Sequence, residues 1–206
     1  MKQQPIIIGI TGGSGSGKTY FLKKLLQLFD KQDITVFSMD NYYLPKDKQK
    51  KDRNGVENFD RPESLDHERF VRDLVILKSG NDISIREYNF NHRDTPSTVI
   101  DIRATPVIIV EGIFTFHYKA VNDLLDLKIF IDAPEYLMLK RRIIRDNNER
   151  GYDINDVLYR FEHHVMPAYK QYIYPSRLEA DLIILNHDNF ENAMSVLSAY
   201  IKQIIN

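Results

Sequence analysis

The stretch IIIGITGGSGSGKTYF, residues 6–21, constrains the fold more than any other part of this 206-residue chain. An apolar run breaks into glycines, ends on Gly-Lys-Thr and continues into a segment with apolar residues at helical spacing. Residues 12–19 match the pattern G-x-x-x-x-G-K-[ST] between a predicted strand and a predicted helix. This context predicts a phosphate-binding loop, because backbone N–H groups at a helix N-terminus can approach phosphate oxygens closely.

We expect the whole loop to contact a nucleotide. Its residues are Gly12, Gly13, Ser14, Gly15, Ser16, Gly17, Lys18 and Thr19. Lys18 would reach the β- and γ-phosphates, and the Thr19 hydroxyl would bind Mg²⁺. A flexible Gly/Ser-rich turn is the alternative, and the flanking strand and helix argue against it.

Short apolar runs predict the strands of a parallel sheet. They lie at 6–10, 34–38, 107–110, 127–131 and 182–185. None alternates with period two, as expected for strands buried on both faces, and helix-like segments separate most of them. The pattern predicts an α/β fold of the P-loop nucleoside triphosphate hydrolase type, with a sheet of about five parallel strands flanked by helices.

Apolar periodicity places the main helices. We expect them over 22–29, over 65–77 before Gly80, from Pro134 onward, over 154–172 with a bend near Pro167, and over 190–205.

Two stretches depart from this alternation of strands and helices. Alternating segments around a turn-rich centre predict a β-hairpin added to the parallel sheet at about 83–102. The charged stretch 45–55 lacks apolar residues, which predicts a mobile surface loop. With a lid at about 145–156, we expect residues 1–206 to form one domain.

Composition excludes several classes of protein. A net charge of −1 gives no overall basic field to attract nucleic acid or anionic lipid. No apolar stretch reaches the roughly 18 residues of a membrane helix, and the first apolar run is too short for a signal peptide. The chain has 0 cysteines, which fits a reducing compartment. We therefore expect a soluble cytoplasmic protein that binds neither nucleic acid nor membrane.

Two carboxylates follow predicted strands. Asp40 comes after the second strand and Glu111 ends the run VIIVEG. Open α/β sheets bind ligands at the carboxyl ends of their strands, so either group could hold Mg²⁺, and Asp40 could accept a proton from an attacking hydroxyl. The pattern leaves open that Asp40 is a turn or capping residue and that Glu111 only meets solvent.

Arginines gather on the helix predicted after Pro134. Arg141, Arg142 and Arg145 lie on it, and Arg150 follows in NNERG. A solvated basic face is one interpretation. The phosphate-binding loop favours the other, that arginines neutralise the charge of a transferring phosphoryl group.

These motifs together make the chain resemble the uridine-cytidine kinases of the uridine kinase and phosphoribulokinase superfamily. The matching segments run from residue 6 to about residue 189. In order they are GGSGSGKT, SMDNYY, ENFDRPESLD, REYNF, VIIVEGIFTF, IFIDAP, RRIIRDNNERG and MPAYKQYIYPSRLEADLII. The resemblance implies ATP-dependent transfer of the γ-phosphate to the 5'-hydroxyl of uridine or cytidine.

The resemblance also implies roles for single residues. Asp40 would be the general base and would share Mg²⁺ with Thr19 and Glu111. Asp60 and Arg142 would bind the ribose.

For the base and the lid, the resemblance implies that Phe59 packs on the pyrimidine and that Tyr88 and a histidine, here His92, read its edge. Arg145 and Arg150 would belong to the lid over the ATP phosphates.

Three positions depart from the family pattern. His92 comes one residue early in EYNFNH, Tyr152 replaces a lid arginine, and Arg160 stands where relatives have a glutamine that touches the ribose. These departures leave uridine or cytidine preference open. The donor base, ATP or GTP, is open as well, since LNHDNF (185–190) matches the adenine-side loop only loosely. The resemblance further implies a homo-oligomer, a tetramer.

Two other functions remain as alternatives. A kinase of the same superfamily could act on phosphoribulose, pantothenate or nicotinamide riboside, although ENFDRP and EYNF argue against this. A P-loop switch that binds GTP without fast catalysis should carry N-K-x-D, which the chain lacks. Its D-x-x-G, Asp52 to Gly55, falls in the charged stretch.

Overall fold

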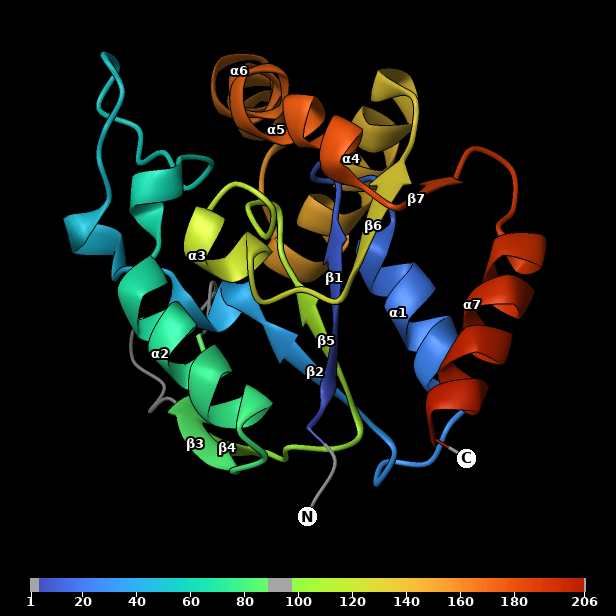
Figure 1. The fold of residues 1–206 in the computed structure, drawn as a ribbon. Helices are drawn as coiled ribbons and strands as arrows, with labels where there is room; N and C mark the ends of the chain where they lie inside the picture. The colour runs from blue at the N-terminus through green and yellow to red at the C-terminus, as the bar shows by residue number, and fades with distance from the viewer. Residues whose placement is uncertain (1–3, 89–97, 206) are drawn as a thin grey trace.

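The computed structural model describes residues 4–88 and 98–205, with the backbone alone for residues 149 and 150. Its central sheet is parallel and has the strand order β2-β5-β1-β6-β7 (Figure 1). The strands are β1 (Ile6–Thr11), β2 (Ile34–Ser38), β5 (Val107–Glu111), β6 (Leu127–Asp132) and β7 (Leu182–Leu185). Each strand coincides with a predicted apolar run to within one residue, which confirms the predicted fold class.

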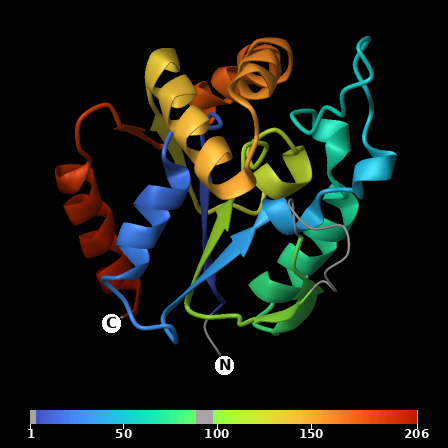
Figure 2. The ribbon, with the colours of Figure 1, turned by 180° about the vertical axis from the view of Figure 1, so that it is seen from behind.

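Helices cover both faces of the sheet. Helices α1 (Lys18–Leu26) and α7 (Glu191–Ile205) lie on one face, and α2 (His67–Lys78) and α3 (Lys119–Asn122) lie on the other (Figures 1 and 2). Neighbouring residues of β1 enter opposite cores: Ile7 packs with Phe70 of α2, and Ile8 packs with Phe21 of α1. Burial on both faces explains why the strands lack period-two alternation.

A long helical arm lies over the carboxyl ends of the strands. It begins with α4 (Glu135–Arg150), preceded by Pro134. It continues through α5 (Ile154–Arg160), the π-helix η4 (Phe161–Val165), α6 (Met166–Ala168), the π-helix η5 (Tyr169–Ile173) and the 3-10 helix η6 (Tyr174–Glu179). The sequence predicted one bent helix over 154–172. The structure instead has wide turns on both sides of Pro167, which has no N–H to donate to a regular α-helical bond.

The predicted hairpin forms a separate sheet. Strands β3 (Ile83–Arg86) and β4 (Val99–Ile102) pair antiparallel, with Ile83 opposite Ile102. The expectation that this hairpin extends the parallel sheet is wrong, because Ile85 and Ile102 turn into the core beside α2. The centre of the hairpin, including His92, lies outside the described residues.

The charged stretch 45–55 is tied down by polar contacts in place of apolar ones. It contains the 3-10 helix η2 (Lys46–Lys48), and Lys51 pairs with Glu57 in an antiparallel bridge. Two other 3-10 helices, η1 (Met39–Tyr42) and η3 (Pro62–Ser64), flank this stretch. Over the described ranges, no helix has the length and apolar character needed to span a bilayer.

Candidate active site

The loop between β1 and α1 has the backbone of a phosphate-binding loop. Gly15 has a φ of 82°, and a Cβ there would lie 2.3 Å from the carbonyl oxygen of Met138. Gly17 has a φ of 97° at the N-cap of α1, and a Cβ there would lie 2.1 Å from Asn186 Nδ2. Both positions combine left-handed backbone with close neighbours, so a side chain fits at neither.

Lys18 points back over this loop. Its Nζ donates hydrogen bonds to the carbonyl oxygens of Gly12 at 2.8 Å and Gly13 at 3.2 Å. Burial lowers the pKa of Lys18, and the charges of Glu111 and Asp40 oppose that effect. The ammonium is thus fixed where the loop amides gather, a position suited to the terminal phosphates of a nucleotide.

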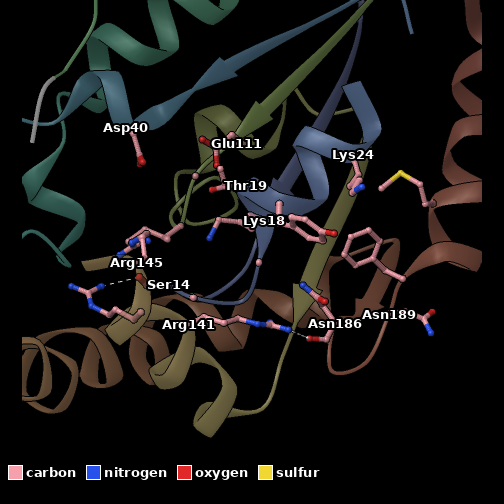
Figure 3. Close-up of a pocket in the computed structure, with 18 of the residues that line it drawn as sticks. Ser14, Lys18, Thr19, Lys24, Asp40, Glu111, Arg141, Arg145, Asn186 and Asn189 are labelled. Atoms are coloured by element: carbon pink, nitrogen blue, oxygen red, sulfur yellow. Dashed lines mark hydrogen bonds between the residues drawn. The ribbon is translucent and has the colours of Figure 1, made fainter. Parts of the chain in front are cut away.

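Glu111 and Asp40 approach the loop from the ends of neighbouring strands. Ser38 Oγ donates to Glu111 Oε1 at 2.5 Å, and Asp40 begins the turn after β2, where it is exposed. Burial raises the pKa of Glu111, and the negative charge of Asp40 raises it further. Lys18, Thr19, Glu111 and Asp40 face one space in Figure 3.

This set of groups fits Mg²⁺. Hydroxyl and carboxylate oxygens from Thr19, Asp40 and Glu111 are the hard ligands that the ion prefers. A desolvated carboxylate beside a second one is favoured in its charged form by a cation, and Glu111 is such a group. Among the described residues no group of three or more His, Cys, Asp or Glu side chains could hold a metal. Mg²⁺ commonly binds only one or two carboxylates and keeps waters and substrate phosphates as its other ligands.

A buried carboxylate on α4 organises two of the arginines. Asp146 lies 3.1 Å from Arg142 Nε, and it accepts from Arg145 Nε at 2.9 Å and lies 2.8 Å from Arg145 Nη2. Arg142 Nη1 donates to Ser14 Oγ in the loop at 2.8 Å (Figure 3). The ion pairs therefore hold both guanidinium groups above the phosphate-binding loop.

Arg141 has a different position from these two. Its guanidinium donates to the carbonyl oxygens of Ser16 at 3.1 Å and Asn186 at 3.0 Å. Asn186 Nδ2 donates to the same Ser16 carbonyl at 2.8 Å. Arg141 and Asn186 thus brace the loop from helix α4 and from the end of β7.

Aromatic residues continue the site away from the loop. The Tyr43 ring lies 5.9 Å from Phe59 and 5.7 Å from Tyr88, measured between centroids. The backbone N–H of Tyr88 donates to Asn41 Oδ1 at 3.1 Å, which holds the segment after β3 beside the turn that carries Asp40. Burial and the charges of Asp40 and Asp60 raise the pKa of Tyr43.

One cavity of about 990 Å³ joins all these parts. Its lining includes Phe59 and Asp60, as well as Lys18, Asp40, Glu111 and the three arginines. It also includes Asp188, Asn189, Tyr20 and Phe190, and the rings of Tyr20 and Phe190 meet edge to face at 5.7 Å. The segment LNHDNF therefore reaches the cavity, as the resemblance implied.

The structure brings most of the predicted site residues to this cavity. Among the predicted residues that the structure describes, Gly12, Gly13, Ser16 and Tyr88 do not line the cavity, although Tyr88 contacts Tyr43. His92 and the Arg150 side chain lie outside the described part of the chain.

Sequence reasoning missed three contributors: Ser38, Asp146 and the brace formed by Arg141 and Asn186. The pairing of Asp146 with Arg142 could have been predicted from the sequence, because the two residues are four apart on one helix and therefore share a face.

A glycine-rich loop at the end of β1, with a lysine, a threonine, two carboxylates and arginines facing it, defines a P-loop kinase. The fold agrees with that class. Phosphoribulokinase from Rhodobacter spheroides is similar at a TM-score of 0.59 with 18% identity, over 92% of this chain and 74% of that one. D-glycerate 3-kinase from Cryptococcus neoformans var. grubii is similar at a TM-score of 0.59 with 15% identity, over 81% of this chain and 78% of that one.

The particular family follows from the sequence. Residues 7–190 match the model of the "Phosphoribulokinase / Uridine kinase family", and the chain belongs to that family. It is 37% identical to a uridine kinase of Borrelia duttonii over 97% of this chain and 95% of that protein. It is 33% identical to a uridine kinase of Clostridium tetani over 100% and 98%. Uridine-cytidine kinase B of Dictyostelium discoideum is 35% identical over 88% and 75%.

Proposed function

We propose that this protein is a uridine/cytidine kinase that transfers the γ-phosphate of ATP to the nucleoside 5'-hydroxyl. One observation carries the proposal: a single cavity is lined by the phosphate-binding loop and Asp40 and also by Phe59 and Asp60. The cavity measures about 990 Å³, at the upper end of the roughly 300–1,000 Å³ that ligand pockets span. The relatives named uridine kinase, which match over nearly the whole chain, support the choice of acceptor.

On the donor side, the loop amides and Lys18 would bind the β- and γ-phosphates. Arg142 donates a hydrogen bond to the Ser14 hydroxyl. Gly17 is the N-cap of α1, so the N–H groups at the start of this helix would face the anion. When bound by Thr19, Asp40 and Glu111, Mg²⁺ would supply charge neutralisation at the phosphate oxygens. The base of the donor would lie toward Tyr20 and Phe190. We keep ATP as the donor and GTP as the alternative.

On the acceptor side, Asp60 would bind the ribose hydroxyls together with Arg142, and Phe59 would pack on the pyrimidine. We retain Tyr88 and His92 as the proposed readers of the base edge. Because Tyr88 contacts Tyr43 and not the cavity, it would act on the base after a movement or through Tyr43.

The chemical step would be an in-line displacement. Asp40 accepts the proton of the 5'-hydroxyl while the oxygen attacks the γ-phosphorus. The bond from that phosphorus to the oxygen bridging the β- and γ-phosphates breaks, and ADP leaves with the bonding electrons. Arg145, and Arg150 by resemblance, would neutralise the charge that spreads over the γ-oxygens.

A regulatory nucleotide switch is less well supported. The D-x-x-G sequence that a switch would need places Asp52 against Tyr159 and His164, where it hydrogen bonds protein groups and does not line the cavity. Phe59 and Asp60 also line the cavity beside the phosphate-binding loop, and a switch would not use them.

Assembly and location belong to the same proposal. Strand β7 ends the described sheet and exposes Leu182, Ile183 and Leu185. Such an edge favours association with a second copy, and we propose a homo-oligomer, a tetramer by resemblance, in the cytoplasm. Light scattering at several protein concentrations would test the assembly, and a monomer at all of them would reject it.

The deciding experiment is a panel of acceptors. The purified protein is incubated with Mg²⁺, with ATP or GTP, and with nucleosides, phosphoribulose precursors, pantothenate or nicotinamide riboside, and products are separated by chromatography. We expect UMP or CMP, and we expect the rate of their formation to fall by about 10²–10⁴ with Asp40→Asn, which controls for contaminating kinases. Preferential phosphorylation of a non-nucleoside alcohol, or nucleotide hydrolysis without any acceptor product, would overturn the proposal.

A further inference from the structure

A short hairpin precedes the acceptor end of the cavity and is closed by its own backbone. Lys51 pairs with Glu57, and the Asp52 N–H donates to the Val56 carbonyl at 2.9 Å. The Asp52 carboxylate in turn accepts from the N–H groups of Asn54 at 2.8 Å and Val56 at 2.9 Å. The hairpin is therefore one compact unit, and Asp52 is its internal cap.

The tip of this hairpin is bound to the helical arm by a polar cluster. Asp52 Oδ2 accepts from the Tyr159 hydroxyl at 2.6 Å and lies 2.7 Å from His164 Nε2. Asn54 Nδ2 donates to the same Tyr159 oxygen at 2.7 Å. His164 is only 2% exposed, so this contact is a built-in part of the fold and not a surface encounter.

The wide turn η4 makes this arrangement geometrically available. Tyr159 and His164 are five residues apart, and in a regular α-helix residues at that spacing point in different directions. A π-turn closes i→i+5 bonds and brings such residues toward one side. The π-helix at Phe161–Val165 thus lets both side chains reach one carboxylate oxygen.

A second contact lies next to the acceptor site itself. Arg160 Nη1 donates to the Glu57 carbonyl at 3.0 Å, and Asp156 holds the Arg160 Nε at 2.9 Å. Glu57 comes directly before the segment 58–60, in which Phe59 and Asp60 line the cavity. The arm that makes these contacts follows α4, which carries Arg142 and Arg145.

We propose that Asp52, Tyr159 and His164 form a latch that positions the segment 57–60 against the arm carrying the arginines. The latch is separate from the groups that touch the reactants, and its members are positioning residues. It rests on the proposed function for the identity of the acceptor. Its loss should weaken acceptor binding and leave donor binding at the loop intact, because the latch contacts only the acceptor half.

Tyr159→Phe tests the latch most directly, since it keeps the ring and removes the hydroxyl that bonds Asp52 and Asn54. We expect the KM for uridine or cytidine to rise about tenfold, as expected for loss of a hydrogen bond to a charged group. The KM for ATP should change less than about twofold. The control is Glu162→Gln, a side chain 81% exposed on the same turn, for which neither KM should change. Equal rises in both KM values, or no rise in either, would overturn the latch.

Two further measurements separate positioning from general destabilisation. Tyr159→Phe combined with Asp52→Asn should raise the acceptor KM by less than the product of the single effects, because both remove the same interaction. Amide hydrogen exchange at Asn54 and Val56 should speed up in Tyr159→Phe, without any need for turnover. If the acceptor panel yields another alcohol, the proposed substrate fails, and the KM comparison with that alcohol decides on the latch. Unchanged exchange at both amides overturns the latch in either case.

Discussion

Asp146→Asn is the change for which the structure gives the sharpest expectation. The carboxylate is 1% exposed and lies between two guanidinium groups, 3.1 Å from Arg142 and 2.8 Å from Arg145. Asparagine has nearly the same shape and keeps one acceptor oxygen, but it removes the negative charge. Arg142 and Arg145 are then left close together without a counterion.

The expected loss of stability follows from burial. Removing one partner of a buried ion pair costs about 3–5 kcal/mol, because the other charge stays desolvated. The retained amide oxygen and the partial exposure of Arg145, 33%, place Asp146→Asn at the lower end, about 3 kcal/mol. Domains are stable by about 5–15 kcal/mol, so the variant should still fold.

The matched control is another arginine and acid pair at i,i+4 on a helix. Arg72 and Glu68 are 65% and 78% exposed, with 3.9 Å between their charged atoms. Glu68→Gln should therefore change the free energy of unfolding by less than about 0.5 kcal/mol. Both variants are measured by urea denaturation followed by circular dichroism.

Catalysis supplies the second readout for Asp146→Asn. If Asp146 orients Arg145 over the γ-phosphate, kcat should fall by about a hundredfold, since misplacement of a catalytic group by about 1 Å has that effect. The KM for ATP should change by a smaller factor than kcat, because Lys18 and the loop amides still bind the phosphates. A stability loss under 1 kcal/mol would refute the buried ion pair. An unchanged kcat at temperatures where the variant is folded would refute the positioning role.

Four further changes test the proposed roles. Asp40→Asn should lower kcat by about 10²–10⁴ with little change in either KM, as expected for loss of a general base; near-normal turnover in a coupled ADP assay would remove Asp40 from that role. Asp60→Ala should raise the nucleoside KM about tenfold and leave the ATP KM unchanged, so equal effects in steady-state kinetics would count against a ribose site. His92→Tyr should alter the ratio of kcat/KM for uridine over cytidine, and an unchanged ratio would exclude His92 as a base reader. With EDTA present, Glu111→Gln should raise the free energy of unfolding at pH 8 by about 1–3 kcal/mol. The reason is that burial raises the pKa of Glu111 from 4.5 to about 7, so the folded chain loses stability relative to the unfolded chain as the pH rises from about 4.5 to about 7, and the full loss persists at pH 8. The gain should disappear below pH 4.5 in denaturation series, and a gain independent of pH would contradict this origin.

The sheet was predictable because its strands are short, apolar and separated by helical segments. The length of each apolar run and the polar or glycine residues that bound it are local features of the sequence, and they predicted the strands. Strand β1, for example, begins at Ile6 as predicted. The pairing of β3 with β4 was predictable, but the position of this hairpin in the fold was not. The alternation of apolar and polar residues shows which face of each strand is buried, but it does not show which element that face packs against. Burial of Ile85 beside α2 decided the placement, and that contact is tertiary.

The site divides along a similar line. The phosphate-binding loop is contiguous in sequence, so its pattern alone predicted eight residues, five of which line the cavity. The latch joins residues more than 100 positions apart, 107 for Asp52 and Tyr159. Contacts between residues so far apart in sequence cannot be predicted from their spacing. The π-helix that aligns Tyr159 with His164 could not be predicted from the residue types in this segment either. The contacts of the stretch 45–55 could not be predicted for that reason, because its partners are polar and distant in sequence.

Burial also separates the proposed roles of the two strand-end carboxylates. Glu111 is desolvated and fixed by Ser38, and its raised pKa shows that holding the negative charge there is costly without a cation. Asp40 is an exposed residue of η1 that lines the cavity together with Phe59 and Asp60, where it could take a proton from an acceptor. Similar acids at adjoining strand ends are thus suited to different tasks, as paired carboxylates in enzymes often are. On this reasoning Glu111 would serve the metal in every state of the cycle, and Asp40 would serve it while also receiving the proton of the acceptor hydroxyl.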